Sequence, residues 1–359
     1  MGIIRNMKSI AKKVETGIRL NAEEGAKLFE MDILELGRLA NIARETINGR
    51  KAFYVVNRHV NHTNVCVNRC RFCAFSRNEG EDGAFCMTME QILARADEAK
   101  EMGAKELHIV GGLHPSLPFD FYIEMLREIH NRHPQIHIQA FTAVEIAHLA
   151  TISGLSVEQT LTALCEAGLG SLPGGGAEVF ASRVRTMLCA EKLPGEQWLD
   201  VMRTAHRLGL RSNATMLYGH IETPQEKIDH LIKLRELQDE TGGFLAFIPL
   251  SFHPENTDIP NTAGSTGIGD LRHIAIARLM LDNFSHIKAF WIMLGIKLAQ
   301  VSLSFGADDM DGTVVEEKIT HMAGARTPQG VTVARMRELI EEAGRIPIER
   351  DTLYNEVAR

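Results

Sequence analysis

The chain has 359 residues, of which 45% are hydrophobic and 24% charged, so it can bury a sizeable core as one large globular domain or two small ones. Its formal net charge of −7 and the lack of a basic stripe argue against nucleic acid as a partner, so local groups must hold any anionic substrate. Six cysteines, three of them within residues 66–73, do not resemble a secreted disulfide framework and favour a reducing cytoplasm. No apolar run approaches the roughly 20 residues that would cross a bilayer, so we expect no membrane partner.

The chain begins with a predicted helical extension. Residues 21–49 show a helical apolar period, with Asn21 and Asp32 as candidate N-caps and Gly49 as the stop. Residues 53–61 predict a short hairpin that leads into the next strand. We therefore expect an N-terminal helical extension and hairpin over residues 1–58.

Residues 59–345 alternate between strand-like and helix-like patterns. Eight strands that alternate with helices predict an α/β fold of the (β/α)8 TIM-type barrel class rather than an open doubly wound sheet. Residues 346–359 are predicted to form a C-terminal tail. The predicted strands are 60–66, 106–112, 137–141, 170–173, 212–218, 246–252, 288–293 and 301–305. The predicted helices are 88–102, 120–132, 157–167, 196–208, 224–241, 269–283, 295–300 and 332–343.

Polar or glycine-rich segments follow seven of the predicted strands. In a barrel of this class, functional residues lie at the carboxyl ends of the strands and in the loops after them. The acidic run 308–312 misses the register of a calcium loop, so we reject calcium there. The one-sided arrangement predicts an active site at that end of the barrel.

The segment after the first predicted strand carries Cys66, Cys70 and Cys73, spaced Cys-x3-Cys-x2-Cys. Three thiolates can bind three irons of a [4Fe–4S] cube and leave the fourth iron open to a small molecule. Zinc usually needs a fourth protein ligand and often uses paired Cys-x2-Cys knuckles, and the sequence has no second knuckle. The spacing favours the cluster over zinc or unliganded cysteines. We expect the three remaining cysteines to be free thiols, and these are Cys86, Cys165 and Cys189.

This motif, with Phe72 just before the third cysteine, resembles the signature of radical S-adenosylmethionine enzymes. Over nearly its whole length the chain further resembles the aminofutalosine synthase family of the futalosine route to menaquinone. The same branch contains dehypoxanthine futalosine cyclase and the two radical components of deazaflavin (F0) synthesis. The segments that carry the resemblance are 64–76, 172–180, 205–206, 213–223, 242–244, 247–250 and 252–257.

The resemblance implies a [4Fe–4S] cluster and S-adenosylmethionine, the latter consumed as a co-substrate. It implies that the 5′-deoxyadenosyl radical adds to the vinyl carbon of 3-[(1-carboxyvinyl)oxy]benzoate, an aromatic enol-ether carboxylate. The adduct radical then attacks the arene, migrates and loses CO2 or bicarbonate, which gives 6-amino-6-deoxyfutalosine. An electron donor such as flavodoxin or ferredoxin and a cytoplasmic location are expected.

Five residues are candidate cofactor contacts. Phe72 borders the cluster, and the pair Gly111 and Gly112 looks like the glycines that hold the methionyl amino group, with an ordinary tight turn as the alternative. Glu178 follows the glycine run 174–176 and could meet the ammonium or ribose hydroxyls, or else serve as a structural partner of an arginine. Arg185 could pair with the methionyl carboxylate, or else form a surface salt bridge.

Three residues are candidate catalytic groups. His220 and Glu222 follow the fifth predicted strand, and His253 follows the sixth. Each could hold substrate or move a proton, and either histidine could instead be a satisfied structural residue.

Overall fold

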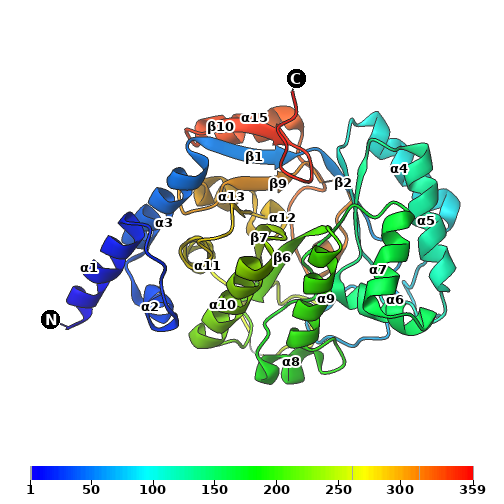
Figure 1. Ribbon diagram of the computed structural model, residues 1–359, viewed down its shortest axis with the longest axis horizontal. Helices are drawn as coiled ribbons and strands as arrows, with labels where there is room; N and C mark the ends of the chain where they lie inside the picture. Colours follow the sequence, from blue (N-terminus) through cyan, green and yellow to red (C-terminus); the bar gives the residue numbers. More distant parts are fainter. Residues whose placement is uncertain (1, 261, 315, 359) are drawn as a thin grey trace.

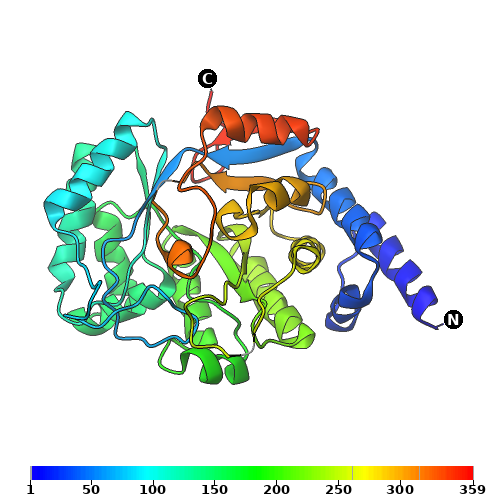
Figure 2. The same cartoon turned by 180° about the vertical axis from the view of Figure 1, so that it is seen from behind.

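The computed structural model describes residues 2–260, 262–314 and 316–358 (Figures 1 and 2). Its centre is a parallel seven-stranded sheet in sequential order, which curls so that helices cover its outer side (Figure 1). This arrangement confirms the predicted (β/α)8 TIM-type fold. The strands are β2 (Asn57–Val60), β3 (Glu106–Ile109), β4 (His137–Ala140), β5 (Ser171–Leu172), β6 (Arg211–Tyr218), β7 (Phe244–Ser251) and β8 (His286–Ile287). The helices around them are α4 (Met89–Glu101), α5 (Phe119–Arg132), α6 (Ala143–Ser153), α7 (Val157–Glu166), α8 (Ser182–Cys189), α9 (Gly195–Arg207), α10 (Pro224–Thr241) and α11 (Gly267–Met280).

A second parallel sheet, in the order β10-β1-β9, closes the barrel. It contains β1 (Lys51–Val55), β9 (Asp309–Gly312) and β10 (Ile346–Arg350). A parallel bridge joins Lys288 to Asp309, so β9 continues the large sheet beyond β8. Because β1 pairs with β9 and leads directly into β2, the two sheets together complete the circle. The segment expected as a C-terminal tail therefore supplies a strand, β10, and helix α15 (Val333–Glu342) precedes it at the top of Figure 1.

Two predictions near the first strand are wrong. Residues 53–61 do not form a hairpin, because β1 pairs with β9 and β10 whereas β2 pairs with β3. The first barrel strand also ends at Val60, where the predicted strand 60–66 begins. Consequently the whole cysteine segment is a loop.

The prediction of the last barrel strand is also wrong. Residues 301–305 lie at the end of helix α13 (Ile296–Ser302) and in the turn after it. The acidic run expected as a loop forms β9 instead. Its carboxylates are buried because each pairs with a cation from another element, which a local pattern cannot reveal. The pairs are Asp308 with Arg278, Asp309 with Arg350, and Asp311 with Lys288.

The N-terminal extension packs on the outside of the barrel against α10 and α11 (Figure 2). It comprises α1 (Gly2–Glu15), α2 (Ala22–Lys27), the short 3-10 turn η1 (Leu28–Glu30) and α3 (Ile33–Asn48). The expected caps are confirmed: Asn21 accepts from Glu24 N, Asp32 accepts from Leu34 N, and Gly49 ends α3 with a φ of 56°. In the described ranges, no helix is long and apolar enough to cross a membrane.

Candidate active site

A cavity of about 320 Å³ runs through the barrel. At the carboxyl end of the strands it is lined by the cysteine loop, by Gly111 and by the glycine run 174–176. At the other end it reaches Asn57 and Glu106, the first residues of β2 and β3. Glu106 and Gly111, which both line the cavity, are five residues apart along β3 and the segment after it, so the cavity extends along the length of this strand.

The cysteine loop is fixed by backbone hydrogen bonds to the elements around it. Val67 N donates to Leu113 O at 3.0 Å, and Arg71 N donates to Leu188 O at 2.8 Å. Within the loop, Cys66 N donates to Arg77 O at 3.1 Å and Cys73 N to Cys70 O at 2.9 Å. The three cysteines lie half-buried along the wall of the cavity, as the prediction of a joint site requires.

The pair Gly111 and Gly112 lines the same wall, directly against the segment between β2 and the cysteines. A β-carbon on Gly112 would lie 2.2 Å from Val65 O, and one on Gly111 would lie 2.5 Å from the His62 ring. Only glycine permits this approach. The pair therefore does more than form a tight turn, because it also lets the cysteine loop close onto β3.

The thiols suit an iron–sulfur cluster. Burial raises the pKa of Cys70 to about 12, and the nearby ammonium of Lys192 opposes this rise by favouring the thiolate that binds iron. Among the described residues, no three His, Cys, Asp or Glu side chains meet closely enough for a single ion. A cube binds each thiolate through a different iron, so its cysteines need not converge on one point. The residues present therefore fit the cluster.

Glu178 lines the cavity beside the cysteines. Its backbone adopts a left-handed φ of 49°, held by a hydrogen bond from Leu217 N to Glu178 O at 3.0 Å. Its carboxylate pairs with Lys192 Nζ at 2.6 Å, and that ammonium also lies 5.2 Å from the centre of the Phe72 ring. Burial alone would lower the pKa of Lys192, but Glu178 and the thiols of Cys70 and Cys189 raise it, so the lysine is charged.

Lys192 was missed by the sequence analysis, because it lies in a connecting segment without a motif. Arg185, which was the predicted cation, is buried and does not line the cavity. Its guanidinium donates to Ala177 O at 2.8 Å and also to Leu193 O. Arg185 thus joins the segments that carry Glu178 and Lys192.

Glu145 is a second lining residue that was missed, although it lies in one of the polar segments after the strands. Its carboxylate accepts from Gly111 N at 3.0 Å and from Thr142 N at 2.7 Å. Burial raises the pKa of Glu145 to about 7 despite these hydrogen bonds. The capping box that joins Thr142 to Glu145 at the start of α6 was the available signal.

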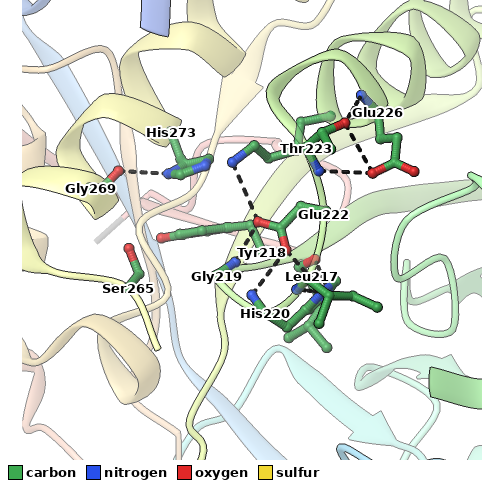
Figure 3. A network of polar contacts seen from close by, with 12 residues as sticks. Leu217, Tyr218, Gly219, His220, Glu222, Thr223, Glu226, Ser265, Gly269 and His273 are labelled. Atoms are coloured by element: carbon green, nitrogen blue, oxygen red, sulfur yellow. Dashed lines mark hydrogen bonds and ion pairs between the residues drawn. The ribbon is translucent and has the colours of Figure 1, made fainter. Parts of the chain in front are cut away.

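His220 and Glu222 are not among the described residues that line the cavity. Figure 3 shows them in the turn after β6, where His220 Nε2 lies 2.9 Å from Leu217 O. Glu222 accepts from Gly219 N at 2.7 Å and from His220 N at 2.9 Å, and Lys227 Nζ lies 3.4 Å away. Burial would raise the pKa of Glu222, but His220, Lys227 and the backbone donors hold it well below its ordinary value.

His253 does line the cavity, and its Nε2 lies 3.0 Å from Met293 O. Deeper in the barrel, the cavity wall contains further polar residues that the sequence analysis did not single out. They lie within strands rather than after them, where barrel interiors are usually filled by branched apolar side chains.

Comparison with known proteins agrees with this geometry. Residues 60–234 match the Radical SAM superfamily, and residues 241–358 match the CofH/MqnC C-terminal region. Among solved structures, methylornithine synthase superimposes with a TM-score of 0.76 over 94% of this chain and 97% of its own, at 17% identity, which shows a shared fold. A barrel of this kind with three cysteines at its mouth is a radical S-adenosylmethionine protein. Its cofactors are a [4Fe–4S] cluster and S-adenosylmethionine.

Relatives of higher sequence identity identify the family within this superfamily. The chain is 48% identical to aminodeoxyfutalosine synthase of Thermus thermophilus, over 97% of this chain and 95% of the relative. It is 44% identical to aminodeoxyfutalosine synthase of Streptomyces coelicolor, over 97% and 93%. It is 41% identical to 5-amino-6-(D-ribitylamino)uracil–L-tyrosine 4-hydroxyphenyl transferase of Methanopyrus kandleri, over 97% and 95%. The chain belongs to the aminodeoxyfutalosine synthase family of radical S-adenosylmethionine enzymes.

Proposed function

We propose that this enzyme joins the adenosyl group of S-adenosylmethionine to 3-[(1-carboxyvinyl)oxy]benzoate and forms 6-amino-6-deoxyfutalosine for menaquinone biosynthesis. The observation that carries the proposal is a deep cavity with three cysteines at its mouth, in a chain 48% identical to an aminodeoxyfutalosine synthase. The cavity extends from the cysteine loop to Glu106 at the start of β3, and in this proposal its inner part holds the aromatic substrate beyond the cofactor.

Cys66, Cys70 and Cys73 hold the cluster in this proposal. When bound, the cluster supplies the electron that cleaves S-adenosylmethionine to methionine and the 5′-deoxyadenosyl radical. Phe72 and the pair Gly111 and Gly112 border the cofactor. The Lys192 ammonium and the Glu178 carboxylate offer partners of opposite charge to its carboxylate and ammonium groups.

The remaining candidates have two kinds of role. His253 faces the cavity and can contact substrate, whereas Arg185, His220 and Glu222 act as positioning residues from outside it. Apolar side chains from β7 and the loop after it line the cavity, where they exclude water from a radical intermediate. These are Ile248, Leu250 and Phe252.

The proposed electron donor is a protein such as flavodoxin or ferredoxin, and the proposed location is the cytoplasm. Val67, inside the cysteine loop, is 45% exposed, so a donor protein can approach the loop from outside. Thiols that must stay reduced to bind iron favour a reducing compartment.

The test is anaerobic turnover of the reconstituted enzyme with S-adenosylmethionine, a reductant and one substrate at a time. The enol ether should give an adduct that carries the adenosine. Two alternatives are tested in parallel: dehypoxanthine futalosine for a cyclase, and tyrosine with 5-amino-6-(D-ribitylamino)uracil for the activity named in the Methanopyrus relative. Turnover of either one, with none of the enol ether, would overturn the proposal.

A further inference from the structure

The inner end of the cavity is polar, although interiors of parallel barrels are usually apolar. Its wall includes Asn57 and His59 from β2, Glu106 and His108 from β3, and Lys288 after β8. Polar side chains buried in a barrel are costly unless they have partners. A buried polar group whose hydrogen-bonding capacity is not used within the protein therefore marks a position for a ligand.

Lys288 is 3% exposed and has donors to spare. Its Nζ lies 3.0 Å from Asp311 Oδ1, which is the one hydrogen bond that it makes among the described residues. An ammonium group has three N–H donors, so two remain for the cavity. The described wall of the cavity contains one further Lys or Arg side chain, Lys192, which is paired with Glu178 at the cysteine end.

His59 is the second group with unused hydrogen-bonding capacity. It is 7% exposed and lies against the cavity, and its ring stacks on His108 with centroids 4.5 Å apart. Its ring nitrogens make no hydrogen bond to any residue that the structure describes. Burial, together with His108, lowers the pKa of His59 to about 4, so near pH 7 the imidazole is an uncharged donor.

The carboxylates nearby already have partners within the protein. Asp311 is held by Lys288, and Glu106 accepts from Asn57 Nδ2 at 3.2 Å. Glu317 accepts from Thr320 N at 3.0 Å and lies 3.3 Å from His321, whose pKa it raises to about 9. Glu106 makes its contact with Asn57 through one oxygen alone, so the acceptors at this end are not all used. The donors still unengaged are two N–H groups of Lys288 and the ring N–H of His59, and an anion is a ligand that both residues can bind.

We propose that Lys288 and His59 bind the carboxylate on the benzene ring of the substrate. This inference rests on the proposed function, in which the vinyl carbon reacts beside the cysteine loop. The ring carboxylate is at the opposite end of that substrate from the reacting carbon. With the vinyl group next to the cofactor, on its inner side, the ring carboxylate points toward the inner end of the cavity, where Lys288 lies.

The experiment pairs a substitution with a substrate that lacks the same group. Binding of 3-[(1-carboxyvinyl)oxy]benzoate and of 2-phenoxyacrylate, which lacks the ring carboxylate, is measured on the reconstituted enzyme and on Lys288→Met. We expect the substitution to weaken binding of the first ligand about 10- to 100-fold, as for a lost charge-assisted hydrogen bond, and to leave binding of the second within about 2-fold. Lys288→Arg should restore part of the affinity, and the exposed Lys297→Met is the matched control.

Retained S-adenosylmethionine binding by Lys288→Met shows that the variant is folded. If that variant fails to fold, His59→Gln is measured in the same way and should show the same selective loss. Equal losses for both ligands, or an unchanged affinity for the ring carboxylate, would refute the inference while the proposed function stands. If the wild type does not bind or convert the enol ether, the proposed function itself fails.

Discussion

Glu178→Gln tests the cofactor end of the cavity. The Glu178 and Lys192 side chains are 10% and 14% exposed, and their charged atoms are 2.6 Å apart. Glutamine keeps the shape of the side chain but removes its charge. We expect the affinity for S-adenosylmethionine to fall by about 1–3 kcal/mol, or roughly 5- to 150-fold, as for the loss of one charge-assisted hydrogen bond. The cluster should remain intact.

The assay is a binding titration on the anaerobically reconstituted variant, with iron content and melting temperature measured on the same sample. Lys192→Met provides the second arm of a double-mutant cycle. If Glu178 contacts the cofactor directly, its substitution weakens binding in both backgrounds. An unchanged cofactor affinity together with a lower melting temperature would show that Glu178 does not contact the cofactor and serves only to neutralise Lys192.

Two further predictions concern the scaffold around the site. Gly112→Ala should bind much less iron on reconstitution than the wild type, because the new β-carbon would lie 2.2 Å from Val65 O. The control is Gly267→Ala, whose β-carbon meets only Leu298 at 3.8 Å and which should keep its iron. Equal iron contents in the two variants would contradict the prediction. Glu222→Gln should lower the free energy of unfolding by about 1–3 kcal/mol at pH 7. Folding lowers the pKa of Glu222 from its ordinary 4.5, so this contribution to stability is fully present above pH 4.5 and declines as the pH falls from there toward the lowered pKa. The difference in free energy of unfolding between the wild type and Glu222→Gln should therefore be smaller at pH 4 than at pH 7. A stability difference of the same size at both pH values would argue against a stabilising role for the Glu222 carboxylate.

Local signals predicted much of the fold. Caps such as Asn21 and Asp32 depend on a few neighbouring residues, so the helices that they start were found from the sequence. Strand β9 could not be found in this way. Asp309 and Asp311 are acidic residues in a strand, and they are buried because Arg350 and Lys288 come from distant parts of the chain.

The residues of the site also differ in whether a local sequence pattern reveals them. The cysteine loop is contiguous in sequence, and its spacing reports its chemistry directly. Lys192 and Lys288 have no motif, and only the fold brings them to opposite ends of one cavity. His220 was expected at the active site because it follows a strand, but it does not line the cavity. A position after a strand does not determine whether a side chain faces the barrel interior or the surrounding helices.

In the proposed reaction, the adenosyl radical adds to its substrate instead of abstracting hydrogen. The most direct test uses S-adenosylmethionine with two deuterium atoms on the 5′-carbon, together with the enol ether, on the reconstituted enzyme. We predict an adduct that retains both deuterium atoms and forms in a 1:1 ratio with methionine. Free 5′-deoxyadenosine as the only nucleoside product would contradict radical addition.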